Sequence, residues 1–309
     1  MVKIDLITGF LGSGKTTFIK KYAKYLISKG NNIGILENDY GAVNVDMMLL
    51  GDIMGDKCEL EMIAGGCDYE THKRRFRTKL IAMRMSGYDR VIVEPSGIFD
   101  ADEFFDVLYE EPLDTWYEIG SIITVVDAGI ESELNFNSEY LLTSQLSKAG
   151  AVVMSKTAGI NEDKLSAIIN RLNSVMKKFK CERILKDEVI TKNWNEFTDE
   201  DFEKLSKAGH QIYDYEKHFI DKKDYSSVYV IESGVTKEEI EEKARKLFTG
   251  KAFGNVMRIK GFIKDGEKWE ELNATPESFS LKPIDRGQDI IIVIGEELNE
   301  NEIKLCIEK

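Results

Sequence analysis

A lysine and two threonines close a glycine-rich stretch near the start of the chain, and their spacing indicates phosphate chemistry. The stretch GFLGSGKTT, residues 9–17, fits the pattern G-x-x-x-x-G-K-[ST]. Glycines let the loop turn tightly so that backbone N–H groups surround a phosphate chain, while the lysine adds charge and the threonine hydroxyl is a ligand for Mg²⁺. The residues expected to bind a nucleotide here are Gly12, Ser13, Gly14, Lys15, Thr16 and Thr17.

Glu94 is the second residue whose position indicates chemistry. It follows the apolar run Val91-Ile92-Val93, and Gly97 comes three residues later. A carboxylate at the end of a buried strand can support Mg²⁺ or orient water, and a glycine N–H can meet a γ-phosphate, as in a Walker B element. Together with the phosphate loop, this pattern predicts Lys15 and Glu94 as catalytic residues and Thr16 and Glu94 as Mg²⁺ ligands.

A third polar group, ENDYG at residues 37–41, follows a short apolar run at 33–36. In an open parallel sheet, ligands bind at the carboxyl ends of the strands. Two interpretations remain open. Asn38 and Asp39 form a switch loop that senses the γ-phosphate, or the segment is an ordinary turn between a strand and a helix.

These residues need a sheet and helices to position them. Apolar runs and helical periodicity predict strands at 2–7, 33–36, 58–63, 91–93, 119–126 and 151–154, and helices at 17–29, 71–86, 137–149 and 161–179. This alternation predicts an α/β P-loop NTPase fold, with a mostly parallel sheet flanked by helices, over residues 1–220. The charged region 196–224 is expected to carry the chain to a smaller α+β domain, residues 225–309.

The composition argues against several classes of protein. The 309 residues carry a formal net charge of −13, which disfavours a nucleic-acid-binding protein. No apolar run reaches the length of a membrane span, and the N-terminus does not have the pattern of a signal peptide. The cysteines are scattered, so a cytoplasmic location without a disulfide framework is expected; they are Cys58, Cys67, Cys181 and Cys306.

Two clusters of basic or ligand-type residues have ordinary interpretations. The run His72-Lys73-Arg74-Arg75 is expected to be a solvated helix face, with the docking of a partner or a phosphate as the alternative. His210 and His218 lie eight residues apart without ligand-type neighbours and are expected at the surface, not as metal ligands.

Taken together, the motifs resemble the CobW-like family in the SIMIBI branch of P-loop GTPases. GFLGSGKTT is similar to that family's GFLGxGKTT, EPSG at 94–97 to its E-x-x-G Walker B, and ENDYG to its E-N-E-F-G switch segment. RIKGF at 258–262 and VIG at 293–295 are similar to its C-terminal domain. The resemblance covers nearly the whole chain. It implies slow GTP hydrolysis coupled to metal delivery, or to maturation of a metal- or cobalamin-dependent protein, and, by analogy, a homodimer.

Two motifs of that family are incomplete here. Its C-x-C-C loop is present as CDYE at 67–70, so a site for Zn²⁺ or another transition metal would have Cys67 with Glu37 or Glu70 as a harder ligand. Its guanine-reading N-K-x-D is present as SKTA at 155–158. Ser155 and Lys156 remain to bind the base, but Ala158 cannot accept hydrogen bonds from guanine. GTP is the nucleotide that the resemblance implies, and ATP or poor discrimination remains open.

The residues and the resemblance together leave three functions open. The main hypothesis is a nucleoside triphosphatase whose hydrolysis acts as a switch in metal delivery to a client metalloenzyme or corrinoid-dependent protein. The first alternative is a nucleotide-dependent scaffold that hydrolyses almost nothing. The second is a small-molecule kinase with Arg74, Arg75 and Arg77 as a lid, against which the E-x-x-G strand end and the C-terminal module argue.

Overall fold

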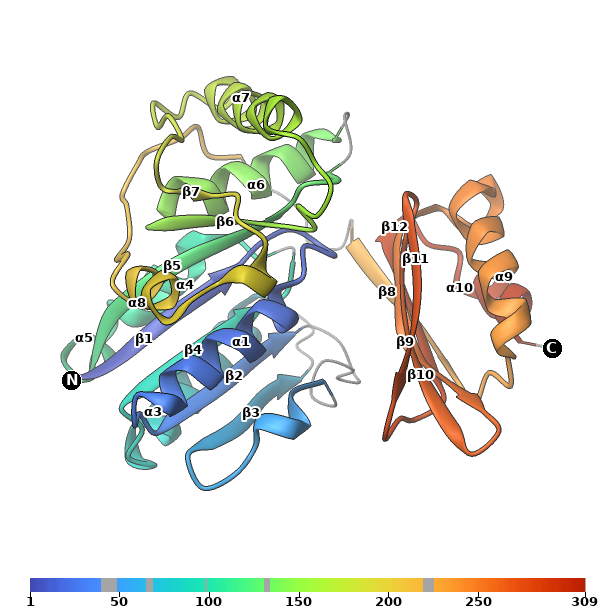
Figure 1. Ribbon diagram of the computed structural model, residues 1–309, viewed down its shortest axis with the longest axis horizontal. Coiled ribbons are helices and arrows are strands. Elements are labelled where there is room, and N and C mark those ends of the chain that lie inside the picture. The colour runs from blue at the N-terminus through green and yellow to red at the C-terminus, as the bar shows by residue number, and fades with distance from the viewer. Residues whose placement is uncertain (40–48, 65–68, 98, 131–133, 219–224, 309) are drawn as a thin grey trace. The chain divides into compact units, whose positions relative to one another are not determined.

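The computed structural model describes residues 1–39, 49–64, 69–97, 99–130, 134–218 and 225–308 (Figure 1). The chain divides into two compact units, Met1–Phe219 and Ile220–Lys309. Each unit has its own sheet and its own hydrophobic core.

A seven-stranded sheet forms the centre of the first unit, and its strand order is β3-β2-β4-β1-β5-β6-β7. Every neighbouring pair is parallel, so all carboxyl ends meet at one edge of the sheet. The predicted P-loop NTPase fold class is confirmed. The strands are β1 Val2–Thr8, β2 Ile33–Asp39, β3 Cys58–Ala64, β4 Arg90–Pro95, β5 Tyr117–Asp127, β6 Ala151–Ser155 and β7 Val189–Ile190.

Helices cover both faces of this sheet (Figure 1). Successive side chains of a strand point to opposite faces, so Leu6 joins the core under α3 and α4 whereas Ile7 joins the core under α1 and α8. The helices are α1 Lys15–Ser28, α3 Tyr69–Met85, α4 Ala101–Leu108, α5 Leu113–Trp116, α6 Phe136–Lys148, α7 Glu162–Lys178 and α8 Asp199–Ser206, with 3₁₀ turns at Gly51–Ile53 and Trp194–Glu196. The sequence patterns missed the short elements α4, α5, α8 and β7.

The expectation that region 196–224 is a charged linker was wrong for residues 199–218. Helix α8 begins at a capping box between Thr198 and Asp201. It buries Phe202 and Leu205, and Phe202 stacks on Tyr25 of α1 with ring centroids 5.6 Å apart. Two apolar residues three positions apart suffice to attach a two-turn helix, and the surrounding charges concealed this signal in the sequence.

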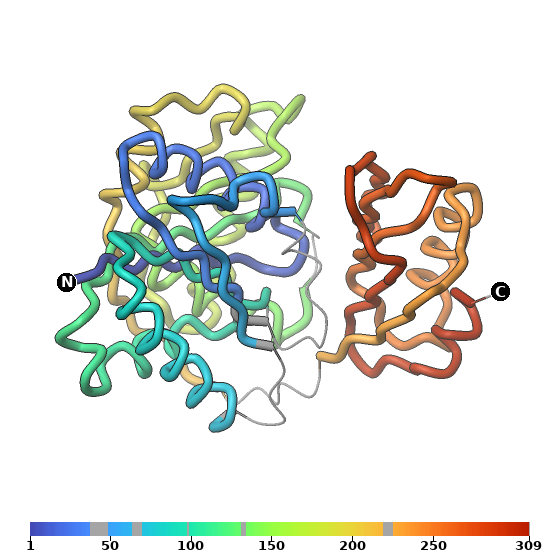
Figure 2. The backbone as a smooth tube through the Cα atoms, turned by 90° about the horizontal axis from the view of Figure 1, so that it is seen from below, coloured from blue at the N-terminus to red at the C-terminus, as the bar shows by residue number. Residues whose placement is uncertain are grey.

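The second unit is a five-stranded antiparallel sheet covered by two helices, as the predicted α+β module requires. The strand order is β11-β10-β9-β12-β8. Helices α9 (Lys237–Thr249) and α10 (Glu300–Ile307) pack on one face of the sheet, which both views show (Figure 1, Figure 2). The strands are β8 Tyr225–Ile231, β9 Asn255–Asp265, β10 Lys268–Thr275, β11 Ser278–Ile284 and β12 Ile290–Glu296.

Candidate functional site

The glycine-rich loop joins β1 to α1 at the carboxyl edge of the parallel sheet. Gly9, Gly12 and Gly14 have φ angles of 147°, 76° and 92°, a region that residues with a β-carbon rarely adopt. A β-carbon on Gly9 would lie 2.2 Å from the carbonyl oxygen of Val125 on β5. The loop therefore needs glycine both for its backbone conformation and for its close approach to β5.

Lys15 is held inside this loop. Its side chain is buried, and Nζ donates a hydrogen bond to the carbonyl oxygen of Gly9 at 2.9 Å. Lys15 is also the first residue of α1, where free backbone N–H groups favour anions. An ammonium group and a helix N-terminus thus meet at one point, and this combination of charges suits a polyphosphate.

Thr16 and Glu94 are in direct contact although 78 residues separate them. The Oγ1 atom of Thr16 donates a hydrogen bond to Oε1 of Glu94 at 2.8 Å. This contact exists because β4 pairs directly with β1, which brings the ends of both strands to the start of α1. A hydroxyl and a carboxylate are oxygen ligands of the kind that Mg²⁺ prefers, so the two side chains fit that ion.

Gly97 lies against the phosphate loop. A β-carbon at this position would lie 2.8 Å from the backbone nitrogen of Leu11. Buried Gln145 of α6 supports the turn, because its Nε2 donates to the carbonyl oxygens of Gly97 at 3.3 Å and Phe99 at 3.2 Å. Sequence reasoning gave Gln145 no role, since only the packing of α6 on the β4 turn reveals it.

The end of β6 holds the two residues expected near the base. Ser155 is buried, whereas Lys156 is exposed and has a φ angle of 55°. Lys156 Nζ lies 2.5 Å from Oδ2 of Asp127, which pairs with Ser155 across β5 and β6. Asp127 Oδ1 accepts a hydrogen bond from the backbone N–H of Gly129 at 2.7 Å. Asp127 directly follows the strand predicted at 119–126, but the sequence patterns did not predict its pairing with Lys156.

Trp194 is a further site residue that the sequence patterns missed. Its ring atom Cη2 lies 3.3 Å from the place where a β-carbon on Gly14 would be. The ring also packs edge-on against Phe18 of α1, with centroids 5.6 Å apart. No local sequence pattern predicts this contact, because Trp194 is far from the phosphate loop in sequence and reaches it only after β7.

The structure describes the side chains of only some of the remaining predicted site residues. Glu37 is buried, and the pairing of β2 with β4 sets it opposite Glu94. Thr17 is exposed on α1. Asn38 and Asp39 belong to β2, but their side chains lie outside the described part of the structure, and so does the whole of Cys67. The described residues contain no group of three or more His, Cys, Asp and Glu side chains that could hold a metal ion.

The histidines are less exposed than expected. His72 is buried in the first turn of α3, so the basic run is not uniformly solvated. His210 is half-buried and its ring lies 5.6 Å from that of Phe105; burial, together with the charge of Lys148, lowers the pKa of its imidazole. His218 packs edge-on against Phe136 at 5.0 Å. Aromatic contacts therefore account for His210 and His218.

Within the described ranges, none of the helices combines the length and the apolar character needed to cross a membrane.

Several curated proteins resemble part of this chain. The zinc chaperone YjiA of Escherichia coli K12 is 26% identical over 181 residues, which is 56% of this chain and 55% of that protein. The zinc chaperone YeiR of the same organism is 28% identical over 158 residues, or 51% of this chain and 47% of YeiR. The zinc-regulated GTPase metalloprotein activator 1 of Schizosaccharomyces pombe is 26% identical over 186 residues, covering 57% and 44%. The chain thus spans about half the length of these curated relatives.

Among solved structures, the Zn(II)-bound YjiA GTPase of E. coli aligns over 100% of this chain and 99% of its own, at 20% identity and a TM-score of 0.41. The hydrogenase maturation factor HypB of Archaeoglobus fulgidus aligns over 66% of this chain and 86% of its own, at 16% identity and a TM-score of 0.41. The model of the CobW/HypB/UreG nucleotide-binding domain matches residues 3–183, more than half of the 309 residues. The chain therefore belongs to the CobW/HypB/UreG family.

Proposed function

We propose that the first unit binds a nucleoside triphosphate with Mg²⁺ and hydrolyses it slowly, as a switch and not as bulk chemistry. The observation that carries this proposal is the hydrogen bond between Thr16 and Glu94, which connects the phosphate loop directly to the Walker B strand β4. Lys15, held 2.9 Å from the Gly9 carbonyl oxygen, supplies the fixed positive charge beside that pair.

In hydrolysis, water attacks the γ-phosphorus and the bond to the bridging oxygen breaks, giving a nucleoside diphosphate and phosphate. Thr16 and Glu94 would hold Mg²⁺, which offsets negative charge on the phosphates when bound. Glu94 supports that ion or orients the water. Lys15 and the loop N–H groups stabilise charge on the phosphates, while Asn38, Asp39 and Gly97 sense the γ-phosphate.

Ser155 and Lys156 are assigned to the base. GTP is the proposed nucleotide because the chain belongs to a family that includes proteins named as GTPases. Ala158 supplies no carboxylate, and hydrogen bonds to charged groups contribute about 1.5–3 kcal/mol each. The preference for GTP over ATP should therefore be weaker than in a site with the complete motif, by about tenfold to 150-fold for each hydrogen bond that is lost.

For the biological role, we propose delivery of a transition metal to a client protein, with Zn²⁺ as the cargo that the names of the relatives suggest. Cys67 and Glu37 are the proposed ligands in this chain, and the client would be a metalloenzyme or a corrinoid-dependent protein. A cytoplasmic location and a homodimer belong to the same proposal.

The test is competition of GTP and ATP against a fluorescent nucleotide with Mg²⁺ present, in the wild type and in Lys15→Ala. Lys24→Ala is the matched control, because Lys24 lies exposed on the same helix and pairs with Asp52. We expect Lys15→Ala to abolish binding and Lys24→Ala to leave it unchanged. Tight binding to Lys15→Ala would overturn the assignment of the loop.

Phosphate release then separates the alternatives. Slow release that depends on Mg²⁺ supports the switch. Tight binding of the Mg²⁺-nucleotide with turnover indistinguishable from buffer identifies a scaffold. Transfer of the phosphoryl group to a metabolite in place of water identifies a kinase.

A further inference from the structure

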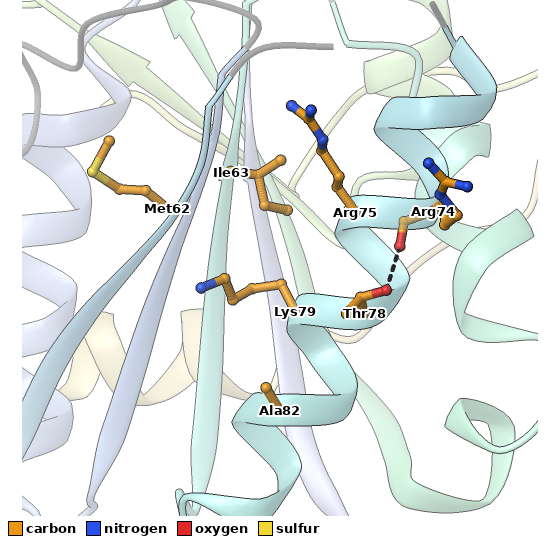
Figure 3. Close-up of a pocket in the computed structure, with 7 residues that line it drawn as sticks. All are labelled: Met62, Ile63, Arg74, Arg75, Thr78, Lys79 and Ala82. Atoms are coloured by element: carbon orange, nitrogen blue, oxygen red, sulfur yellow. Dashed lines mark hydrogen bonds between the residues drawn. The ribbon is translucent and has the colours of Figure 1, made fainter.

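A pocket separate from the phosphate loop lies between strand β3 and helix α3 (Figure 3). Its volume is about 440 Å³, within the range of about 300–1,000 Å³ typical of ligand sites. Met62, Ile63 and Ala82 provide apolar lining, and Arg74, Arg75 and Lys79 provide cationic groups. In Figure 3, Arg75 and Lys79 extend from α3 toward the side on which Met62 and Ile63 lie.

The pocket follows the outer edge of the parallel sheet. Strand β3 is the terminal strand of the sheet, and β2 is its only strand partner among the described residues. Met62 and Ile63 are consecutive, so their side chains point to opposite faces of β3, and a pocket lined by both extends around the edge of the strand. Apart from the pairing with β2, the described residues show one isolated antiparallel bridge at β3, between Gly55 and Cys58, the first residue of the strand.

The charge of α3 differs from that of the whole protein. The chain has a net charge of −13, yet α3 has one acidic residue, Glu70, and six cationic ones. Lys73 and Arg77 pair with Glu110 at 2.8 Å and 3.4 Å, and Lys79 pairs with Glu61 of β3 at 2.8 Å. Arg74 and Arg75 are exposed at the pocket. The six cationic residues are Lys73, Arg74, Arg75, Arg77, Lys79 and Arg84.

The chemistry of the lining selects the kind of ligand. A free phosphate would be held by buried polar donors, but Arg74 and Arg75 are exposed, and the lining combines the polar Thr78 with the apolar Met62, Ile63 and Ala82. A ligand that complements this surface carries carboxylates beside an apolar group. In the part of the chain that the structure describes, no strand pairs with the outer edge of β3, so an extended peptide can pair with the main-chain groups of that edge.

We propose that the β3–α3 pocket binds a short extended segment of a partner protein in which acidic residues flank an apolar side chain. The apolar side chain lies on Ile63 and Ala82, and the carboxylates pair with Arg74 and Arg75. The segment's backbone adds to the edge of β3. The surface is distinct from the phosphate loop, so the proposal does not depend on nucleotide hydrolysis.

The experiment uses the full chain and a fluorescein-labelled synthetic peptide, DDELFEDD, followed by fluorescence anisotropy. Two matched peptides serve as probes of the ligand: DDESSEDD lacks the apolar anchor, and KKKLFKKK reverses the charge. The variants are Arg74→Glu/Arg75→Glu for the cations and Ala82→Trp for the apolar floor. Lys164→Glu/Lys177→Glu is the control, because it makes the same charge change at two exposed positions of α7.

We expect saturable binding of DDELFEDD to the wild type and to the α7 control. The arginine variant should bind about tenfold more weakly or worse, because two charge-assisted contacts become repulsive. Ala82→Trp should weaken binding by filling the pocket, and its circular dichroism should match the wild type because Ala82 is exposed. Absence of saturable binding to the wild type, equal losses in the arginine variant and the control, or undiminished binding of DDESSEDD would each overturn the proposal.

Discussion

Replacement of Gly97 by alanine tests whether the Walker B turn sets the position of the phosphate loop. The added β-carbon would lie 2.8 Å from the nitrogen and 2.9 Å from the Cα of Leu11. Ordinary contacts begin at 3.4 Å, so backbone atoms must move apart by about 0.6 Å. Gly97 is not among the residues with positive φ, so the effect is steric and does not arise from backbone strain.

Overpacking of this kind costs typically about 1–3 kcal/mol. If the phosphate loop moves to relieve the contact, the full cost falls on the nucleotide-binding conformation. The Kd for Mg²⁺-nucleotide should then rise by about fivefold to 150-fold. If the turn moves instead, the cost appears as a lower thermal midpoint, since Gln145 holds that turn through Gly97 and Phe99.

The assay is a competition titration with a fluorescent nucleotide, accompanied by thermal unfolding of the unliganded protein. Gly51→Ala is the control, because a β-carbon at Gly51 would meet no atom within 4 Å. We expect the control to match the wild type in both measurements. A Gly97→Ala variant with wild-type affinity and a wild-type midpoint would refute the reasoning.

Three further predictions concern other contacts of the first unit. Arg90→Met should lower the free energy of unfolding, measured by urea titration, by about 3–5 kcal/mol. The reason is that the fully buried carboxylate of Asp5 loses its cation. The double variant Arg90→Met/Asp5→Asn should regain part of this loss, because it removes the unpaired charge. Trp194→Phe should abolish the change in tryptophan emission on nucleotide addition, since the ring contacts Gly14; an undiminished change would contradict this. Hydrogen bonds from Lys192 and from the Thr198 backbone lower the pKa of Asp201 from 3.8 to about 2, so its contribution to stability is complete above pH 3.8 and is lost as the pH falls toward 2. The Tm deficit of Asp201→Asn should accordingly be larger at about pH 6 than at about pH 3, and an equal deficit at both would contradict the assignment.

The core of the site was readable from the sequence because its signals are local. The glycines of residues 9–17 specify the geometry of the loop, and Glu94 comes directly after the apolar run Val91-Ile92-Val93. Both patterns depend on neighbouring residues alone, so no knowledge of the sheet was needed to place Lys15, Thr16 and Glu94 as candidates. Strand and helix periodicity likewise sufficed for the fold class, which the structure and the family match confirm.

Short elements with few apolar residues were not readable in this way. Helix α8 buries little more than Phe202 and Leu205, and β7 has only two residues. Each element is stabilised by packing against the rest of the first unit. Its few apolar residues lie among charged ones, so its sequence shows no clear periodicity. The sequence therefore suggested a linker in a region where the chain completes the first unit.

The sequence by itself determined the local patterns: a glycine-rich stretch that fits a phosphate-binding loop, a carboxylate after an apolar strand, and Ala158 at the position where the resembled family has an Asp. Only the tertiary structure decided which distant residues meet. The strand order β2-β4-β1-β5-β6 brings Glu94 to Thr16 and Asp127 to Lys156, and the return of the chain after β7 sets Trp194 on Gly14. The physical reason is that a parallel sheet places the carboxyl ends of strands far apart in sequence at one edge, in an order that local periodicity does not encode.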